Sequence, residues 1–374
     1  MSSFWLEESR PELPGRPLEG RVDVAVVGGG VTGCACAHVL AGAGMRVRLH
    51  EAREIASGAS GRNGGFAVRG GAQTYDDARK QLGRERALAY WQLTERYVDR
   101  MAELAGDAFR RTGSLRLADR EERALLQAEY EALREDGFDA AWRDKLREPL
   151  AARYHGAFFN PPDGSIQPAR WVRRLAARAS EAGADLRERD RVSSLDELDA
   201  EQVVLATDGY TEGLLPELDA AVTPTRGQVV VTEPLARRLF ACPHYARHGY
   251  DYWQETPDGR LVAGGSRDAA LDEEQTAEEA TTEVVQAHLD RLVAELTGNS
   301  ARITHRWSGI FGVTEDRLPL VGRVPGHEGL WVACGYSGHG NVLGLACGEL
   351  VARAILGRLD PMLELFEPAR LMRG

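Results

Sequence analysis

Residues 21–51 read RVDVAVVGGGVTGCACAHVLAGAGMRVRLHE, and this stretch decides the fold of the chain. Its apolar, β-branched start, Val22 to Val27, predicts a buried strand. The small residues from Val31 to Ala43 predict a helix, and Val47 to His50 predict a second strand. A strand, a glycine turn, a helix and a second strand together indicate a βαβ unit of a parallel sheet.

Three glycines in the turn, Gly28, Gly30 and Gly33, follow the G-x-G-x-x-G spacing. The first permits the tight turn, the second lets a pyrophosphate approach the backbone, and the third lets helix and strand pack closely. The helix N-terminus offers free N–H groups and a positive dipole to phosphates. Glu51, at the end of the second strand, can accept the hydroxyls of an adenosine ribose. The pattern predicts a dinucleotide site, since an ordinary glycine-rich turn would leave Glu51 unexplained.

The composition is ordinary for a globular enzyme: 43% of the 374 residues are hydrophobic and 28% are charged. This length predicts about two domains. The net charge of −11 argues against nucleic acid or an anionic membrane as the main partner. The first residues, MSSFWLEESRPELP, have no apolar signal region, and no run approaches about 18 apolar residues. We therefore expect a cytoplasmic protein without a membrane span.

Two residue types constrain the chemistry. The five cysteines include no C-x-x-C pair, so they indicate neither a disulfide framework nor a metal site. Lysine is nearly absent, because Lys80 and Lys145 are the only two among 46 basic residues. The cysteines are Cys34, Cys36, Cys242, Cys334 and Cys347.

The rest of the chain alternates between two patterns. Helical periodicity covers residues 75–106, and Pro168 can begin another helix before strands return near residues 186–206. From Ala221 to Val313 the pattern instead indicates an antiparallel sheet with one covering helix. The first domain is therefore expected to be interrupted by the second and then resumed.

Two further glycine-rich loops resemble ligand-binding segments. Residues 56–72, ASGASGRNGGFAVRGGA, have too little apolar surface to form core and can wrap a ligand with backbone N–H groups, although a flexible surface loop is the alternative. Residues 335–340, GYSGHG, lie between a predicted strand and a predicted helix. His339 in this loop is either a ligand contact or a turn residue.

Together these blocks resemble the FAD-dependent D-amino-acid oxidase superfamily. Within it the chain is similar to the glycine oxidase and sarcosine oxidase branch, and above all to the gamma-glutamylputrescine oxidoreductase group, which shares the FW arm, the SGRNGG loop and the SGHG loop. The blocks at 167–175, 225–234 and 307–322 also fit, so the resemblance covers nearly the whole chain. It implies an α/β fold: a Rossmann-like FAD-binding domain with an inserted α+β substrate domain built on an antiparallel sheet. The expected ranges are 1–19 for an N-terminal arm, 20–72, 150–215 and 315–374 for the FAD-binding domain, and 73–149 and 216–314 for the substrate domain.

The resemblance implies FAD as the cofactor and assigns its contacts. The glycine turn contacts the pyrophosphate, and the carboxylate of Glu51 contacts the adenosine ribose. The SGRNGG loop lines the pyrophosphate, the ribityl chain and the flavin ring. The SGHG loop faces the pyrimidine side of the ring. The residues are Gly28, Gly30, Val31, Thr32, Gly33, Glu51, Ala52, Ser57, Arg62, Asn63, Gly64, Gly65, Val192, Thr207, Gly309, Gly338, His339, Gly340, Asn341 and Val342.

Two departures from the sarcosine oxidase pattern matter. The strand at Trp307 to Val313 has no cysteine to tether the flavin, so we expect noncovalent FAD. The stretches at 259–265 and 340–345 have no lysine, although the family places lysines there for oxygen activation and for substrate binding. The electron acceptor is therefore expected to be either O2 or another acceptor.

The implied reaction is oxidation of a C–N bond in a small amine or amino acid. A hydride passes from the α-carbon to flavin N5, and water hydrolyses the resulting imine to a carbonyl product. No metal is expected. The substrate-binding candidates are Arg69, Tyr250, Tyr252, Trp253, Phe311 and His339. Aromatic rings can enclose an amine, although Tyr252 and Trp253 fit a sheet core equally well. Arg69 and Arg317 are the candidates for a carboxylate.

Three alternatives remain at this point. The first is an NAD-dependent dehydrogenase, which would leave the two later glycine loops without a role. The second is a flavin-binding subunit of a larger electron-transfer assembly. The third, an enzyme that acts on an amine within tRNA, is disfavoured by the acidic charge balance.

Overall fold

The apolar run of the opening stretch forms β1, which lies inside a six-stranded sheet. The computed structural model describes residues 2–372. All neighbouring strands of this sheet are parallel except the antiparallel edge pair β16 and β17. In spatial order the strands are β16 (Leu320–Arg323), β17 (Leu330–Cys334), β10 (Ala200–Leu205), β1 (Val22–Val27), β2 (Val47–Glu51) and β9 (Asp185–Glu188).

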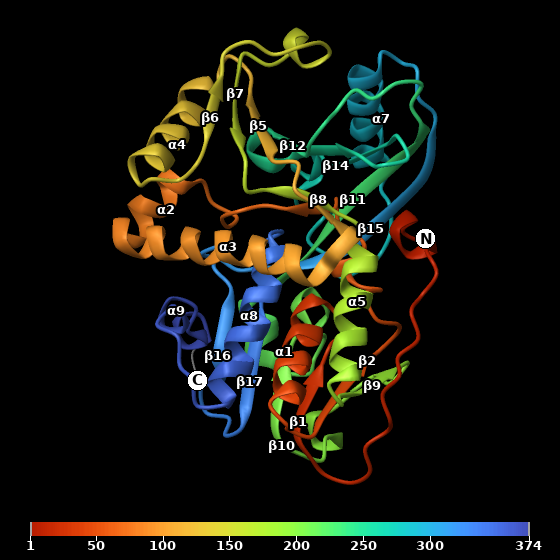
Figure 1. The fold of residues 1–374 in the computed structure, drawn as a ribbon, viewed down its shortest axis with the longest axis vertical. Helices are drawn as coiled ribbons and strands as arrows, with labels where there is room; N and C mark the ends of the chain where they lie inside the picture. Colours follow the sequence, from red (N-terminus) through yellow and green to blue (C-terminus); the bar gives the residue numbers. More distant parts are fainter. Residues whose placement is uncertain (1, 373–374) are drawn as a thin grey trace.

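Three helices cover one face of this sheet: α1 (Val31–Gly42), α5 (Pro168–Glu181) and α8 (Gly340–Ile355) (Figure 1). Small residues let α1 approach its neighbours. A Cβ at Gly33 would lie 1.9 Å from the carbonyl oxygen of Gly28. Close packing of this kind requires glycine, because any side chain would displace the strand from the helix.

The second sheet has eight strands, and all its neighbours are antiparallel except β12 and β5. Helix α7 (Glu283–Thr297) packs on it through an apolar cluster. In spatial order the strands are β15 (Ile303–Val313), β11 (Thr223–Pro234), β14 (Arg260–Gly265), β13 (Asp251–Glu255), β12 (His244–Ala246), β5 (Ser114–Ala118), β7 (Gly156–Asn160) and β6 (Ala141–Arg143). A small sheet of β3 (Phe66–Ala67), β8 (Gly164–Ile166) and β4 (Phe109–Arg110) lies beside it.

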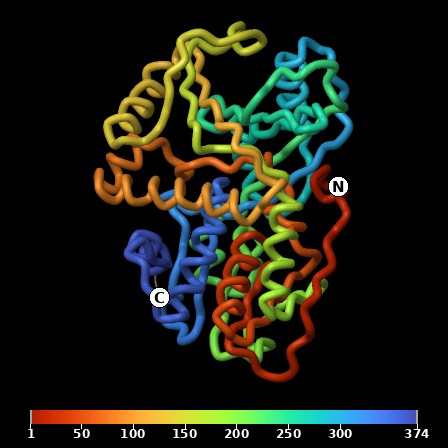
Figure 2. Tube along the Cα trace, in the orientation of Figure 1, coloured from red at the N-terminus to blue at the C-terminus, as the bar shows by residue number. Residues whose placement is uncertain are grey.

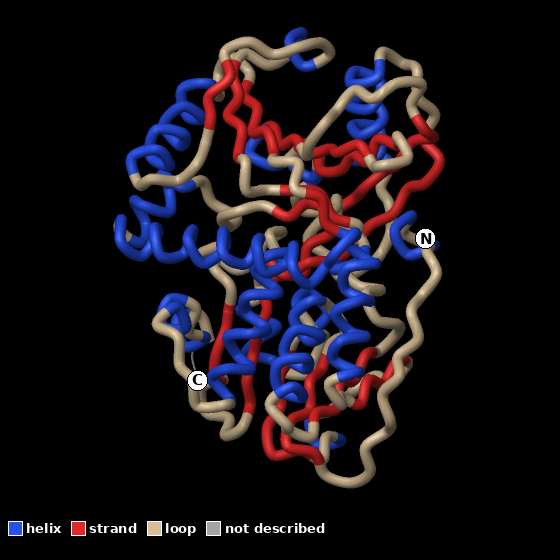
Figure 3. The backbone as a smooth tube through the Cα atoms, in the orientation of Figure 1, coloured by secondary structure: helices blue, strands red, loops and turns tan. Residues whose placement is uncertain are grey.

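The helix predicted over 75–106 is two helices, α2 (Tyr75–Leu82) and α3 (Arg84–Ala105). Gly83 separates them with φ +84°, a conformation that favours glycine. Helix α4 (Arg123–Glu135) lies above α2 in Figure 1. Helix α3 crosses the middle of the molecule between the two large sheets (Figure 1, Figure 3).

The chain enters the lower half of the molecule three times, as the red, green and blue segments of Figure 2 show. This arrangement confirms the predicted α/β fold, in which a parallel sheet is combined with a mainly antiparallel one. The residue bounds of the two domains stay a prediction. Within the range 150–215 assigned to the first domain, β7 hydrogen-bonds with β5 in the eight-stranded sheet.

Candidate functional site

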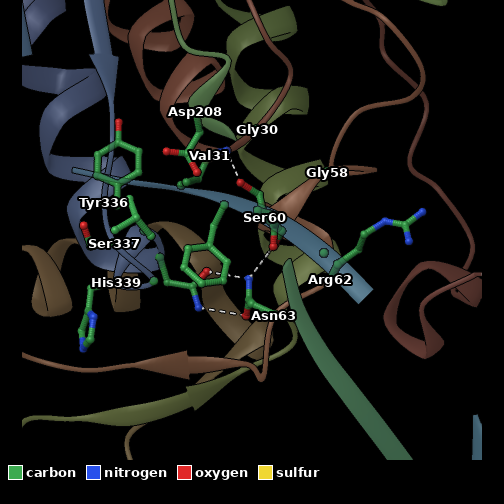
Figure 4. Close-up of a pocket in the computed structure, with 18 of the residues that line it drawn as sticks. Gly30, Val31, Gly58, Ser60, Arg62, Asn63, Asp208, Tyr336, Ser337 and His339 are labelled. Atoms are coloured by element: carbon green, nitrogen blue, oxygen red, sulfur yellow. Dashed lines mark hydrogen bonds between the residues drawn. The ribbon is translucent and has the colours of Figure 1, made fainter. Parts of the chain in front are cut away.

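A cavity of about 1000 Å³ lies between the carboxyl ends of β1 and β10 and the face of the eight-stranded sheet. Open α/β sheets bind ligands at this edge, where neighbouring strands lead to opposite sides. The wall is formed at one end by the β1–α1 turn and at the other by β13, β14 and β15. Figure 4 shows part of this wall, with Gly30 and Val31 near Ser60 and with His339 farther along (Figure 4).

The β1–α1 turn is fixed by the carboxylate that was predicted to accept the ribose. Glu51 accepts hydrogen bonds from the Gly29 N–H at 2.7 Å and from the Arg53 N–H at 2.8 Å. Gly28 has φ +113°, and a Cβ there would lie 2.5 Å from the carbonyl oxygen of Ala206. Glu51 therefore lies at the cavity wall with a fixed carboxylate.

The start of α1 fits an anionic ligand. The helical ladder begins with the hydrogen bond from Cys34 N–H to the Gly30 carbonyl at 3.0 Å, so the N–H groups of the preceding first turn lie outside it. One of them, the Val31 N–H, donates to Ser60 Oγ at 3.1 Å. A Cβ at Gly30 would lie 2.9 Å from that same oxygen, in a turn where the backbone faces the cavity. Such a glycine-lined helix start matches a diphosphate.

An amide pair joins the two later glycine loops. Asn63 Nδ2 donates to Asn341 Oδ1 at 3.1 Å, and Asn341 Nδ2 donates to Asn63 Oδ1 at 3.0 Å. Asn63 also donates to the Ser60 carbonyl, and Asn341 donates to the Phe66 carbonyl. The SGRNGG loop and the start of α8 are thus held together at one place on the cavity wall.

A charged cluster lines the cavity beside the β1–α1 turn. Glu279 accepts from Arg53 at 2.8 Å and from the Tyr210 hydroxyl at 2.6 Å, and it lies 3.3 Å from Arg62. Burial alone would raise the pKa of Glu279, but these partners outweigh it and hold the pKa below its ordinary value. The carboxylate therefore stays charged and links the segment between β14 and α7 to the segments that follow β2 and β10.

The opposite end of the cavity is aromatic. Phe66 contacts Tyr245 and Tyr252, with ring centroids 5.0 and 5.6 Å away. The guanidinium of Arg267 lies 5.0 Å from the ring centroid of Tyr250 and 5.7 Å from that of Phe311. Within residues 2–372 its guanidinium forms no ion pair. The arrangement provides a cation and an apolar box beside one another.

Two titratable groups at this end are neutral at pH 7. Burial, together with Arg116 and Arg267, lowers the pKa of His339 to about 4. Burial raises the pKa of Tyr252 to about 12. His339 Nδ1 has no hydrogen-bond partner among the residues that the structure describes.

The structure brings most of the candidate residues to this cavity. The wall includes Gly28, Gly30, Val31, Thr32, Glu51, Ala52, Arg62, Asn63, Gly64, Val192, Thr207, Tyr250, Tyr252, Gly309, Phe311, Arg317, Gly338, His339, Gly340, Asn341 and Val342. Gly33, Ser57 and Gly65 lie behind it: Gly33 packs α1 on β1, and the carbonyls of Ser57 and Gly65 accept hydrogen bonds from Arg62 and Gln254.

Two substrate candidates lie elsewhere. The Arg69 side chain is 2% exposed and is held by Asn160 Oδ1 at 2.8 Å and by Glu95. Trp253 is fully buried, and its ring stacks on that of His244 with the centroids 5.3 Å apart. Alternate residues of β13 face opposite sides of the sheet. Tyr252 faces the cavity, so Trp253 faces the α7 side. We leave both Arg69 and Trp253 out of the proposed substrate site.

The sequence patterns did not identify several wall residues. Arg116, Tyr245 and Arg267 come from three strands or strand ends whose pairing is long-range. Asp208 and Tyr210 carried a usable signal, because they directly follow β10, a parallel strand. The carboxylate of Asp208 accepts from the N–H groups of Gly312 and Gly335 and so fixes β15 against the end of β17.

Neither a thiol nor a metal cluster belongs to this site in the described part of the chain. All five cysteines are buried, and none lines the cavity. Across residues 2–372 no group of three or more His, Cys, Asp or Glu side chains could hold a metal ion. No helix in the same range is both long and apolar enough to cross a bilayer.

Comparison with known proteins agrees with this geometry. The sequence profile of the family described as FAD dependent oxidoreductase matches residues 23–354. The probable oxidoreductase OrdL of Rhizobium meliloti (strain 1021) is 31% identical, and the match covers 98% of this chain and 91% of that protein. The gamma-glutamylputrescine oxidoreductase of Escherichia coli (strain K12) is 29% identical over 95% of this chain and 89% of its own.

A solved structure shows the same fold. The crystal structure of glycine oxidase from Geobacillus kaustophilus superposes with a TM-score of 0.77 and 27% identity. The superposition covers 95% of this chain and all of that one. The resemblance inferred from the three glycine-rich blocks is thereby confirmed.

Proposed function

This chain belongs to the family of FAD-dependent oxidoreductases, and from that premise we propose that it oxidises the C–N bond of a small amine or amino acid. The cofactor is FAD, so the NAD-dependent alternative is set aside. One observation carries the proposal: a single cavity runs from the glycine turn to an aromatic pocket that contains Arg267. Relatives named for oxidation of an amine and of an amino acid support the substrate class.

The residues present would hold FAD along this cavity. The β1–α1 turn and the start of α1 would bind the diphosphate, and Glu51 would accept the adenosine ribose. The loop at Arg62 to Gly64 and the start of α8 would surround the flavin ring. When bound, FAD supplies the two-electron acceptor that takes a hydride from the substrate, and water then hydrolyses the imine product. We expect the cofactor to be noncovalent, since no cysteine in the described residues lines the cavity.

The chain's own residues would select the reactive form of the substrate. An amine can lose a hydride from its α-carbon when its nitrogen carries a lone pair, so the neutral form must be bound. The positive charges of Arg116 and Arg267 disfavour an ammonium ion nearby and lower its pKa. Neutral His339 lines the same cavity and adds no positive charge beside the substrate.

A substrate carboxylate would find its partner in the same pocket. Arg267 and Arg317 both line the cavity, and a guanidinium binds a carboxylate through paired hydrogen bonds. Arg267 is the better placed of the two, because it lies directly over the rings of Tyr250 and Phe311. The aromatic box would then enclose the apolar part of the substrate.

The test is anaerobic reduction of the purified yellow protein by a panel of amines and amino acids. We expect at least one compound to bleach the flavin absorbance, and heat denaturation to release free FAD. If no member of the panel reduces the flavin, the activity proposed here is wrong, and the subunit of a larger electron-transfer assembly becomes the better hypothesis.

The identity of the electron acceptor is a separate question, which the lack of lysine among the described residues of the cavity wall raises. Neither Lys80 nor Lys145 lines the cavity, so O2 would meet no ammonium group there. Reoxidation of the reduced protein in air, followed by stopped-flow absorbance, decides the matter. Reoxidation that is slow relative to turnover with an artificial dye would identify a dehydrogenase, and fast reoxidation would identify an oxidase.

A further inference from the structure

Five successive carbonyl groups of the SGRNGG loop are all held from behind. The Gly61 carbonyl accepts from Ser3 Oγ at 3.2 Å. The next four accept from Trp307 Nε1, Trp5 Nε1 and Gln254 Nε2. The distances are 2.7 Å for the Arg62 carbonyl, 2.8 Å for the Asn63 carbonyl, and 2.6 and 2.7 Å for those of Gly64 and Gly65.

This arrangement orients the loop toward the cavity. In a planar trans peptide the N–H points away from the carbonyl. The Arg62 and Asn63 carbonyls, fixed toward the rear of the loop, therefore turn the N–H groups of Asn63 and Gly64 toward the cavity that these residues line. The Arg62 N–H instead donates to the Ala59 carbonyl at 3.2 Å within the loop. Successive N–H groups facing one way favour electron-rich ligand atoms.

Two of these donors, Ser3 and Trp5, come from the N-terminal arm. Trp5 lies in the short 3-10 helix Phe4–Glu7, and its side chain is buried, with 4% exposed. The arm itself is tied to α5, where Gln167 Nε2 donates to the Trp5 carbonyl at 3.0 Å and Arg173 donates to the Glu8 carbonyl at 2.8 Å. Figure 1 shows this segment beside α5 and β15 (Figure 1).

Trp5 is also connected, through Asn63, to the contact between the two glycine-rich loops. Its partner residue, Asn63, forms the reciprocal amide pair with Asn341 at the start of α8. A shift of the Asn63 peptide would move that amide and with it the contact to α8. The N-terminal arm thus reaches, through one side chain, both loops that surround the flavin end of the cavity.

We propose that Trp5 is a positioning residue of the FAD site and that the N-terminal arm is a working part of that site. The proposal rests on FAD as the cofactor and not on which amine is oxidised. Without the indole N–H the Asn63 carbonyl loses its buried donor, so the loop relaxes in the apoprotein and must be reordered when FAD binds.

The test compares tryptophan-to-phenylalanine variants of the full chain by titrating apoprotein with FAD. For Trp5→Phe, and for Trp307→Phe, we expect the dissociation constant of FAD to rise by about tenfold, the effect of one lost buried hydrogen bond. Trp171→Phe is the matched control, because Trp171 is fully buried and its Nε1 has no partner in the described residues. It should leave FAD affinity within about twofold of wild type, even if it lowers the thermal midpoint.

The outcomes separate a positioning role from packing. Wild-type FAD affinity in Trp5→Phe would overturn the proposal, and so would an equal loss in Trp171→Phe. If Trp5→Phe cannot be purified in folded form, Ser3→Ala removes a donor to the same loop with little change in volume. We then expect about a threefold weaker FAD affinity, and no change would count against the proposal.

Discussion

At the scale of single residues, two glycines of the same turn perform different tasks. Gly30 has φ −80°, which any residue can adopt, and its missing side chain leaves room beside Ser60 at the cavity wall. Gly33 lies where a Cβ would meet the Gly28 carbonyl at 1.9 Å. We therefore expect Gly30 to serve the ligand, whereas Gly33 serves the packing of α1 on β1.

We expect Gly30→Val to yield a folded protein that does not retain FAD, because the side chain would occupy the place of the diphosphate. Gly33→Ala should instead destabilise the apoprotein by about 1–3 kcal/mol, the usual cost of forcing extra volume into a packed contact. Flavin-to-protein absorbance ratios and urea unfolding of both variants check this. A yellow Gly30→Val protein with one FAD per chain would show that the cofactor is placed wrongly.

Arg267 is one of the two arginines that place positive charge at the proposed substrate end of the cavity. Since a nearby guanidinium disfavours an ammonium ion, its removal should raise the pKa of the bound amine. For Arg267→Gln we expect the alkaline rise of the anaerobic reduction rate to move to higher pH by about one unit. Arg191→Gln is the matched control, because Arg191 lines the other end of the cavity beside Val192. A shift of equal size in both variants would mean that the effect is not local.

At the scale of elements, local sequence patterns predicted the helices and strands that pack against elements close to them in sequence. The run from β1 through α1 to β2 and the helix after Gly338 follow from apolar periodicity and glycine position. The break at Gly83 was missed, since helical periodicity continues across it. The parallel pairing of β12 with β5 joins segments more than a hundred residues apart, and no local pattern encodes it. Arg116 on β5 was missed for that reason.

The pairing of β12 with β13 affects how the stability of the fold depends on pH. His244 on β12 stacks on Trp253, and burial lowers the pKa of His244 to about 3 from an ordinary value of 6.5. Because the pKa of His244 is lower in the folded state than in the unfolded state, protonation favours the unfolded state. The contribution of the neutral His244 to the free energy of unfolding is therefore fully present above about pH 6.5. That contribution is lost progressively as the pH falls toward 3.

For His244→Gln we expect a flatter pH dependence of stability. Between pH 7 and pH 4 the variant should lose about 2–3 kcal/mol less of the free energy of unfolding than wild type does. Urea unfolding of the apoprotein at the two pH values measures this difference. His327→Gln, at an exposed histidine that lies 3.5 Å from Glu217, should change the slope much less than His244→Gln does. A wild-type slope in His244→Gln would contradict the assigned pKa.

At the scale of the whole molecule, the site exists only because two sheets meet. Each glycine loop that we propose to bind the cofactor is continuous in sequence, so the spacing of its residues could identify it. The proposed substrate end is assembled from β13 and β14, which form a hairpin, and from β15, which follows only after α7 and is brought to them by the antiparallel sheet. Sequence could name aromatic candidates there, but it could not separate Tyr252, which faces the cavity, from Trp253, which faces the core.

Glu279 is the clearest link between the two halves across this cavity. It lies between β14 and α7 and contacts Arg53, Arg62 and Tyr210, which all precede the second sheet's main strands. Both arginines line the cavity where the diphosphate would lie. The carboxylate thus fastens the segment before α7 beside the proposed diphosphate site, and we expect release of FAD to require this contact to open.

We expect Glu279→Gln to release FAD about five- to tenfold faster, because a neutral amide holds the two guanidinium groups less strongly than a carboxylate does. Binding of FAD to the apoprotein should also become faster, since the same contact opens for entry. Stopped-flow flavin fluorescence measures both rates. Glu278→Gln is the matched control, because the neighbouring Glu278 is exposed and its side chain forms no ion pair within residues 2–372. A variant with slower release would show instead that Glu279 repels the diphosphate, so that its charge weakens FAD binding rather than retaining the cofactor.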